Sequence, residues 1–350
     1  MVRMDEGMPF LLKYENVAWF EDGAVRILDR RVYPAETRFV TCRSYTEVRQ
    51  AVADMVTQSA GPYTAVGMGM ALAAWEVRGQ AKEKQTAFLQ KAARELANAR
   101  PTAANRYGQI TFRAARLADE ALEAGRDPVE AIVDSVVESL NRRYGTMQLV
   151  GDTLETLVPE GGGILTQCFG ETIIGALIRA ARARGKRFRV YCAETRPYLQ
   201  GARLTASCFV DAGFDTTVLT DNMIAWALGR GDIDLFTSAA DTITLDGHIA
   251  NKVGSLQIAI LAKHFGIPYY VTGIPDRDKP GADSIVPEMR DPRQVLVWNG
   301  VPNCLPGVKA LYPAFDTVPP QLITGIVTDR GIFVPALVGR YFDQGEKTFY

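Results

Sequence analysis

Histidine is scarce in this 350-residue chain, which contains only His248 and His264. Two histidines cannot build a histidine-rich metal site, and they leave little room for a catalytic triad that depends on histidine. The cysteines show no CxxC spacing and are odd in number, so neither a zinc knuckle nor a disulfide scaffold is indicated and free thiols are expected. They are Cys42, Cys168, Cys192, Cys208 and Cys304. If the chain is an enzyme, carboxylates and thiols are left to carry its acid–base chemistry.

Net charge and long apolar runs are also lacking. The 39 basic and 40 acidic residues nearly cancel, so the overall charge does not favour nucleic acid or an anionic membrane as a partner. No stretch approaches the roughly 18 consecutive apolar residues of a membrane-spanning helix, and the first residues lack the apolar core of a signal peptide. We therefore expect a cytoplasmic protein that binds neither nucleic acid nor membrane.

Glycine motifs that bind nucleotides are missing as well. The triplet GGG at 161–163 precedes a predicted strand instead of following one, and GxxxxGK[ST] does not occur. Hydride transfer with a dinucleotide cofactor and nucleotide hydrolysis are therefore both disfavoured.

The chain does contain two regions of different periodicity. After a hairpin-like segment at 17–29, with Asp22-Gly23 as its turn signal, residues 44–145 repeat apolar side chains every three or four positions, which predicts helices. From about residue 160, short apolar strands alternate with helices, which predicts a parallel sheet with helices on both faces. We expect a mostly helical domain with a small β element at 1–148 and a Rossmann-like α/β domain at 149–350. The boundary is expected near residues 146–160, where the segment GDTLETLVPEGGG is rich in turn formers.

The second region has a clear predicted order of elements. Its strands are predicted at 163–168, 188–194, 216–221, 233–241 and 268–274. The intervening helices are predicted at 171–185, 200–213, 222–231 and 250–266.

Polar side chains gather where these strands end. Gln167-Cys168 ends the first strand, Glu194-Thr195-Arg196 the second, Asp221-Asn222 the third and Asp241 the fourth. In an open parallel sheet the carboxyl ends of the strands face one edge, and ligands bind outside that edge. We therefore expect a thiol, several carboxylates, an arginine and an amide to converge on a site.

Structural roles remain open for each of these residues. A cysteine after a strand often packs in the core, and Asp221 could cap the helix that follows it. Glu194 and Arg196 could form a structural ion pair. Farther along, Asn251 could cap the next helix, and Lys252 could reach a phosphate beside the amino end of that helix.

Long segments of the chain resemble the methylthioribose-1-phosphate isomerases and their relatives, which include ribose-1,5-bisphosphate isomerases and regulatory subunits of the eukaryotic initiation-factor nucleotide-exchange complex. The segments include WFEDGAVRILDRRVYP, ARPTAAN, ILTQC, ETRPYLQGARLTA, TDNMIAW, AADTITLDGHIANKVGS and YPAFDTVPPQLITGIVTDRGIF. The resemblance implies an aldose–ketose isomerase of methionine salvage that is a homodimer, acts on a small-molecule sugar phosphate and needs no metal or organic cofactor.

The resemblance also implies particular site residues. The catalytic cysteine and aspartate of the family fall on Cys168 and Asp241, which also stand at two of the strand ends. Substrate contacts fall on Arg100, Gln200, Asn251 and Lys252.

These residue types suit the reaction. An aldose 1-phosphate is held as a ring because its anomeric oxygen is esterified, so the ring oxygen must be protonated while hydrogen moves from carbon 2 to carbon 1. We assign ring opening to Asp241, with a pKa raised by burial, and proton transfer to Cys168, with a pKa lowered by a helix amino end. A hydride shift would use the same two groups differently.

The substrate stays open at this point. The phosphate-gripping arginine of the family's RGAPAIG-like segment has no counterpart in residues 58–67, Phe169 replaces an asparagine, and His248 replaces an aspartate. We expect S-methyl-5-thioribose 1-phosphate or a close analogue. The alternatives are 5-deoxyribose 1-phosphate, ribose 1,5-bisphosphate, or a regulatory protein that senses a phosphosugar or nucleotide without turning it over. Retention of Cys168 and Asp241 favours catalysis.

Overall fold

The computed structural model describes residues 3–100 and 104–345, and the chain divides into two compact units after Gly145. The division falls within α6 (Pro128–Leu157). The first half of the segment expected to form turns, 151–157, is therefore helical, and turn residues follow only at 160–161. Gly151 serves packing instead, because a Cβ atom there would lie 2.6 Å from the backbone of Ala176 in the next helix. We propose that the two units are the domains expected at 1–148 and 149–350.

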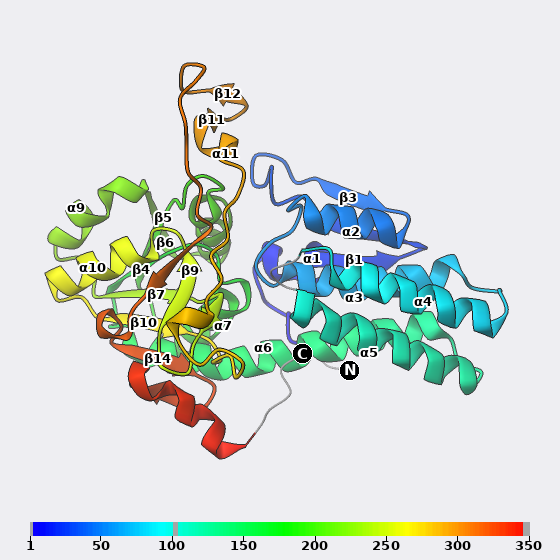
Figure 1. Cartoon of the computed structure of the whole chain (residues 1–350). Coiled ribbons are helices and arrows are strands. Elements are labelled where there is room, and N and C mark those ends of the chain that lie inside the picture. The colour runs from blue at the N-terminus through cyan, green and yellow to red at the C-terminus, as the bar shows by residue number, and fades with distance from the viewer. Residues whose placement is uncertain (1–2, 101–103, 346–350) are drawn as a thin grey trace. The chain divides into compact units, whose positions relative to one another are not determined.

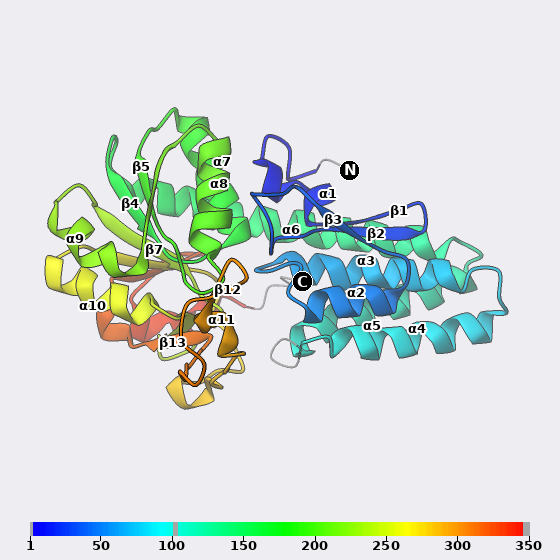
Figure 2. The same ribbon diagram turned by 90° about the horizontal axis from the view of Figure 1, so that it is seen from above.

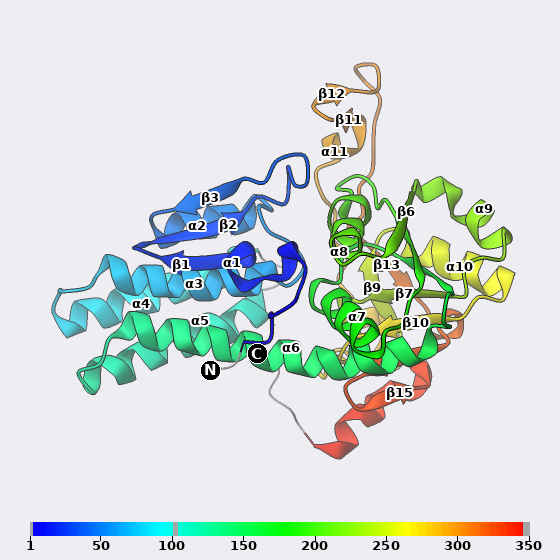
Figure 3. The same ribbon diagram turned by 180° about the vertical axis from the view of Figure 1, so that it is seen from behind.

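The first unit is helical with one small antiparallel sheet. The predicted hairpin is confirmed: β1 (Ala18–Glu21) pairs with β2 (Ala24–Leu28), and its turn residues Asp22 and Gly23 have φ of 49° and 74°. A third strand, β3 (Phe39–Cys42), was not predicted. This sheet lies against α2 and α3 (Figures 1 and 3). The short α1 (Tyr14–Val17) precedes it.

The helices of the first unit pack around α3, which is buried along most of its length. Apolar residues and three glycines occupy most of α3, so it can contact neighbours on every side. The helices are α2 (Tyr45–Ala53), α3 (Gly61–Glu76), α4 (Lys82–Ala97), α5 (Ala104–Glu123) and the first part of α6.

The second unit is built on a mostly parallel seven-stranded sheet in the order β15-β14-β10-β7-β4-β5-β6. Only β15 runs antiparallel to its neighbour. The strands are β4 (Gly163–Thr166), β5 (Arg189–Ala193), β6 (Asp215–Leu219), β7 (Leu235–Ala239), β10 (Tyr269–Thr272), β14 (Gly325–Thr328) and β15 (Gly331–Phe333). The predicted Rossmann-like α/β fold is thereby confirmed.

Helices cover both faces of this sheet, as Figure 2 shows. One face carries α7 (Glu171–Arg184) and α8 (Ala206–Asp211), and the other carries α9 (Ile224–Gly229) and α10 (Ser255–Phe265). Burial on both faces explains why every residue of β4 and all but the last residue of β7 are buried. Because the chain moves outward from β4 in one direction and then returns to β7 on its other side, the sheet has its switch point between these two strands.

Two elements differ from the prediction. The helix expected at 250–266 begins only at Ser255, because residues Ile249–Lys252 form β9 instead. Strand β9 lies between β8 (Thr242–Ile243) and β13 (Phe315–Val318) in a small antiparallel sheet. The helix expected at 200–213 starts with a π-helical turn, Gly201–Thr205, before α8.

The last elements carry the chain away from the sheet and back. Residues 285–311 form an arm with α11 (Arg293–Leu296), β11 (Val297–Trp298) and β12 (Val301–Pro302), which extends at the top of Figure 1. After β13 and β14 the chain ends its described part in a 3-10 helix, Pro335–Gln344. All five cysteines are free, as expected, and Cys192 and Cys208 are core residues.

Within the described residues, none of the helices is both long and apolar enough to cross a lipid bilayer.

Candidate active site

Cys168 and Asp241 follow adjacent strands at the switch point of the sheet. Thr166 of β4 pairs with Thr237 of β7, so the two strands run side by side to their carboxyl ends. Cys168 comes two residues after the end of β4, and Asp241 comes two residues after the end of β7. This is the place where open α/β sheets bind ligands. The strand-end pattern in the sequence therefore marks one local region of the fold.

The backbone at Cys168 is held in an unusual conformation. Its φ is 62°, and that of Thr195 beyond β5 is 64°, in the left-handed region that side chains rarely adopt. The N–H of Cys168 donates to the Thr195 hydroxyl at 3.1 Å, and the Thr205 hydroxyl donates to the Cys168 carbonyl. The Thr195 hydroxyl lies 3.2 Å from Gln167 Oε1. Strained backbone that neighbours hold in place is a common property of functional sites.

Asp221 holds the loop that follows β5 in place. Its two carboxylate oxygens accept backbone hydrogen bonds from Thr195 at 2.9 Å and from Arg196 at 2.7 Å. Asp221 therefore supports the strand-end loop, and Arg196 turns elsewhere, with its guanidinium carbon 4.7 Å from the ring centroid of Trp298. Burial and the charge of Asp221 raise the pKa of Glu194.

The small antiparallel sheet brings Asp241 next to Asn251 and Lys252. The backbone N–H of Asp241 donates to the Ala250 carbonyl at 2.9 Å, so Asp241 stands where β8 begins and Asn251-Lys252 where β9 ends. Asp241 itself is exposed, contrary to our expectation, because the chain has left the covered sheet after Ala239.

Asn251 and Lys252 are both buried. Asn251 does not form the cap of α10 that the sequence allowed; its side-chain amide donates to the Ser255 hydroxyl at 2.9 Å. The cap comes from Asp316 of β13, whose carboxylate accepts from Gly254 and Leu256 N–H at 2.6 and 3.0 Å. Gly254 has a φ of 104°, which favours glycine at this turn.

Lys252 brings a positive charge into the interior of the site. Its ammonium donates to the Ala314 carbonyl at 2.9 Å and lies 4.6 Å from the ring centroid of Phe315. Burial and the neighbouring charge of Arg290 lower the pKa of Lys252, while Cys168 and Asp241 act in the opposite direction. This cation therefore lies within electrostatic reach of both expected catalytic residues.

The thiol of Cys168 keeps its proton at neutral pH. Burial raises its pKa to about 11, and the negative charge of Asp241 adds to this effect, while the charges of Lys252 and Arg290 oppose it. The sequence led us to expect a lowered pKa from the amino end of α7. That expectation is wrong, because the cost of burying a thiolate exceeds the help from the nearby positive charges.

Arg290 belongs to this group of charges and was missed by the sequence reasoning. It pairs with Glu288 at 2.7 Å near the isolated bridge between Met289 and Pro313, at the base of the 285–311 arm. Its guanidinium carbon lies 5.7 Å from the ring centroid of Phe315. The sequence around residue 290 contains no pattern that indicates a site residue, because the position of Arg290 depends on how the arm returns to β13.

The remaining expected residues occupy separate places. Gln200 is buried directly before the π-helical turn. Arg100 belongs to the first unit, after the end of α4. His248 lies in the loop between β8 and β9, where its Nδ1 is 3.0 Å from Asp246 Oδ1.

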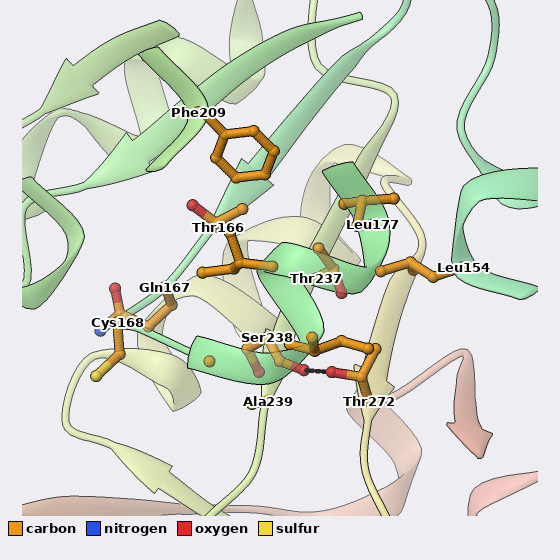
Figure 4. Close-up of a pocket in the computed structure, with 13 residues that line it drawn as sticks. Leu154, Thr166, Gln167, Cys168, Leu177, Phe209, Thr237, Ser238, Ala239 and Thr272 are labelled. Carbon is orange, nitrogen blue, oxygen red and sulfur yellow. Dashed lines mark hydrogen bonds between the residues drawn. The ribbon is translucent and has the colours of Figure 1, made fainter. Parts of the chain in front are cut away.

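An apolar pocket lies beside Cys168 and is shown in Figure 4; its volume is about 330 Å³ when the open solvent at its mouth is included. Leu154, Leu177 and Phe209 line it from the helix side, and Thr166 and Thr237 line it from the sheet. In this view the Cys168 sulfur points away from Leu154 and Leu177. Among the described residues, no three histidine, cysteine, aspartate or glutamate side chains are grouped to hold a metal ion.

The Initiation factor 2 subunit family matches residues 62–335. The methylthioribose-1-phosphate isomerase of Pelotomaculum thermopropionicum is 36% identical over 339 residues, covering 92% of this chain and 91% of its own.

Two solved structures share the fold. The crystal structure of 5-methylthioribose 1-phosphate isomerase from Pyrococcus horikoshii matches with a TM-score of 0.80 and 29% identity, covering 95% of this chain and 97% of its own. That of translation initiation factor eIF-2B, subunit delta, from A. fulgidus matches with a TM-score of 0.79 and 28% identity, covering 91% and 96%. The chain therefore belongs to the Initiation factor 2 subunit family, and its similarity to methylthioribose-1-phosphate isomerases over most of its length identifies it as an isomerase.

Proposed function

We propose that the chain converts a 5-substituted ribose 1-phosphate, S-methyl-5-thioribose 1-phosphate or a close analogue, to the corresponding ribulose 1-phosphate. The observation that carries this proposal is the position of Cys168 and Asp241 after adjacent strands at the switch point, within electrostatic reach of Lys252. A thiol and a carboxyl group supply the two acid–base partners of the reaction, and a buried ammonium favours an anionic substrate.

Two routes differ in the task of Cys168. In the proton-transfer route Asp241 protonates the ring oxygen and the bond from that oxygen to carbon 1 breaks. The Cys168 thiolate then takes the proton of carbon 2 and returns it to carbon 1, while the Asp241 carboxylate takes the proton of the carbon 2 hydroxyl, so that carbon 2 becomes the ketone. In the hydride-shift route Cys168 protonates the ring oxygen, hydride moves from carbon 2 to carbon 1, and Asp241 takes the proton of the carbon 2 hydroxyl. The pKa of about 11 supports the hydride shift, because the thiol holds its proton at neutral pH.

Substrate binding falls to the residues that flank this pair. We propose that Lys252 and Asn251 bind the sugar phosphate from β9 and that Gln200 contacts it from the loop beyond β5. Arg100 is the expected phosphate ligand from the first unit. The segment at 58–67 lacks an arginine, so we expect the phosphate to depend on Lys252, Arg100 and backbone N–H groups.

We also propose a cytoplasmic homodimer that acts in methionine salvage, as the resemblance to its relatives implies. Light scattering of the purified protein measures the dimer directly, at twice the chain mass of 38.4 kDa. A monomer at micromolar concentration would remove that part of the proposal.

The function is tested with a panel of sugar phosphates followed by proton NMR. The panel is S-methyl-5-thioribose 1-phosphate, 5-deoxyribose 1-phosphate and ribose 1,5-bisphosphate. We expect one of them to lose its anomeric signal and gain the carbon 1 methylene of a ketose, and Asp241→Asn to give no product. Binding without turnover by the wild-type chain would favour a regulatory, ligand-sensing role instead.

The same assay separates the two routes. With deuterium on carbon 2 of the substrate, a hydride shift keeps the label on carbon 1 of the ketose. Proton transfer through Cys168 exposes the label to exchange with water, so the ketose would carry hydrogen from the solvent.

A further inference from the structure

A second cavity lies wholly within the first unit, among α3, α5 and α6. It encloses about 450 Å³, counted with its open mouth. Its polar lining comprises Tyr63 and Thr64 from α3, Gln109 and Arg113 from α5, and Ser135, Ser139 and Arg143 from α6. The spacing of four residues between Ser135, Ser139 and Arg143 places them on one face of α6.

Arg143 is a buried cation without a full set of acceptors. Its side chain lines the cavity, the residue is 6% exposed, and its Nε and Nη2 atoms have no hydrogen-bond partner within the described residues. The buried hydroxyl of Thr64 also lacks a partner among these residues. A buried guanidinium with unmade hydrogen bonds is costly, so such a group in a cavity calls for an anion.

The aromatic neighbours of Arg143 do not replace those hydrogen bonds. Its guanidinium carbon lies 6.0 Å from the ring centroid of Tyr63 and 5.9 Å from that of Tyr144. Both distances are at the outer limit of a cation–π contact, about 6 Å. A structural role in which Arg143 only stacks on tyrosine therefore leaves its N–H groups unexplained.

Further positive charge surrounds the same place. Arg113 lines the cavity, and burial together with the charge of Arg113 lowers the pKa of Arg142. Arg142 also has two buried nitrogens, Nε and Nη2, that meet no acceptor in the described part of the chain. Glu138 supplies the opposing charge. Arg142 does not line the cavity, so Arg143 and Arg113 are the arginines that face it, and an added negative charge there would offset their repulsion.

We propose that this cavity binds a phosphate group, either as the free ion or on a small metabolite. Arginine forks bind tetrahedral oxyanions with paired hydrogen bonds, and the hydroxyls of Thr64, Ser135 and Ser139 supply further donors. A carboxylate has only two oxygens and would leave part of this donor set unused. The site belongs to the helical unit and is additional to the isomerase site proposed at the end of β4 and β7.

Calorimetric titration with inorganic phosphate tests the proposal in the full-length Lys252→Met protein, where the isomerase site has lost a cation. We expect one binding event that Arg143→Gln weakens at least tenfold. Ser139→Asp should also abolish it, because an aspartate one turn before Arg143 supplies an internal counter-ion. Ser139→Asp should also have a higher thermal midpoint of unfolding than the protein without it. Arg116→Gln is the matched control, since Arg116 is exposed and pairs with Glu120 at 3.7 Å.

Each outcome decides the proposal. Loss of binding in Ser139→Asp and in Arg143→Gln, with Arg116→Gln unchanged, supports it. If Arg143→Gln does not fold, phosphate binding by Ser139→Asp decides the proposal. No binding of phosphate up to about tens of millimolar, or equal binding in Ser139→Asp, would overturn it. Titrations with glycerol 3-phosphate and with inorganic phosphate show whether the cavity prefers a phosphorylated metabolite or the free ion. Acetate tests selectivity against a carboxylate. Acetate that binds as tightly as phosphate would contradict the proposal.

Discussion

The backbone N–H of Cys168 donates a hydrogen bond to the side-chain hydroxyl of Thr195 across 3.1 Å. Both residues have positive φ, at 62° and 64°, and they follow adjacent strands, β4 and β5. The contact ties the loop of the expected catalytic thiol to a second loop, which Asp221 holds in turn. The position of the thiol therefore depends on side chains that do not themselves need to touch substrate.

Removing the Thr195 hydroxyl should displace Cys168. We expect Thr195→Val to lower kcat at least about tenfold, since the Cys168 N–H and the buried Gln167 lose a partner, at a stability cost of about 1–3 kcal/mol. Thr195→Ser keeps the hydroxyl and is the matched control, with kcat within a few-fold of the parent. Steady-state kinetics and thermal unfolding of the two variants provide the comparison. Equal kcat in both would show that the loop tie does not position the thiol.

Alkylation should be slow at Cys168 despite its partial exposure. Its pKa of about 11 leaves little thiolate at pH 8, so iodoacetamide should modify the exposed Cys304 first, as peptide mass spectrometry can measure. The rate at Cys168 should rise steadily between pH 8 and pH 11. The pKa of Cys168 in the folded protein lies above its ordinary value. Its protonated thiol therefore contributes fully to the free energy of unfolding below about pH 9, and this contribution is lost as the pH rises through 11. Fast labelling of Cys168 at pH 7 would contradict the burial effect.

The Rossmann-like half of the chain could be predicted from the sequence because its short apolar strands alternate with helices, and glycines mark several of the turns between them. Its helices carry their own amphipathic period, so local pattern and tertiary role agree at most positions. The convergence of Cys168 and Asp241 also followed from the sequence, since strand ends in a parallel sheet must share an edge.

Long-range pairing explains what the sequence did not reveal. Asn251 and Lys252 were read as helical because the apolar period of Ser255–Phe265 can be extended backward, but they pair instead with β13, about 65 residues later. Arg290 reaches the site only through the return of the 285–311 arm. The burial of the Cys168 thiol likewise depends on neighbours from several elements, so the direction of its pKa shift could not be derived from the nearby helix alone.

Asp241→Asn should separate chemistry from binding. The amide preserves the size of the side chain but cannot exchange a proton, so we expect turnover to fall below detection while a sugar 1-phosphate still binds. Calorimetry of the variant with the substrate and NMR of the same mixture measure the two properties. Loss of binding together with turnover would assign Asp241 to ligand positioning or to the fold.

Arg100 should neutralise part of the charge of the substrate phosphate, because this chain lacks the second arginine that binds the phosphate in the family. Among the described residues it makes no hydrogen bond or ion pair, and the carbonyl of Arg94 at the end of α4 is bound by Asn98 instead. We expect Arg100→Ala to raise KM for the sugar 1-phosphate about tenfold or more, roughly 1.4 kcal/mol, with unfolding temperature retained. A lower unfolding temperature with unchanged KM would reveal a structural arginine.

The turnover of Cys168→Ser on the identified sugar 1-phosphate is the most direct test of the proposed isomerase site. The substitution changes one atom at the switch point, so circular dichroism and thermal unfolding should match the parent. We expect ketose formation, followed by proton NMR, to fall at least about a hundredfold, the low end for removing a positioned acid–base group. Ketose formation within a few-fold of the parent would contradict the role of Cys168 in the reaction.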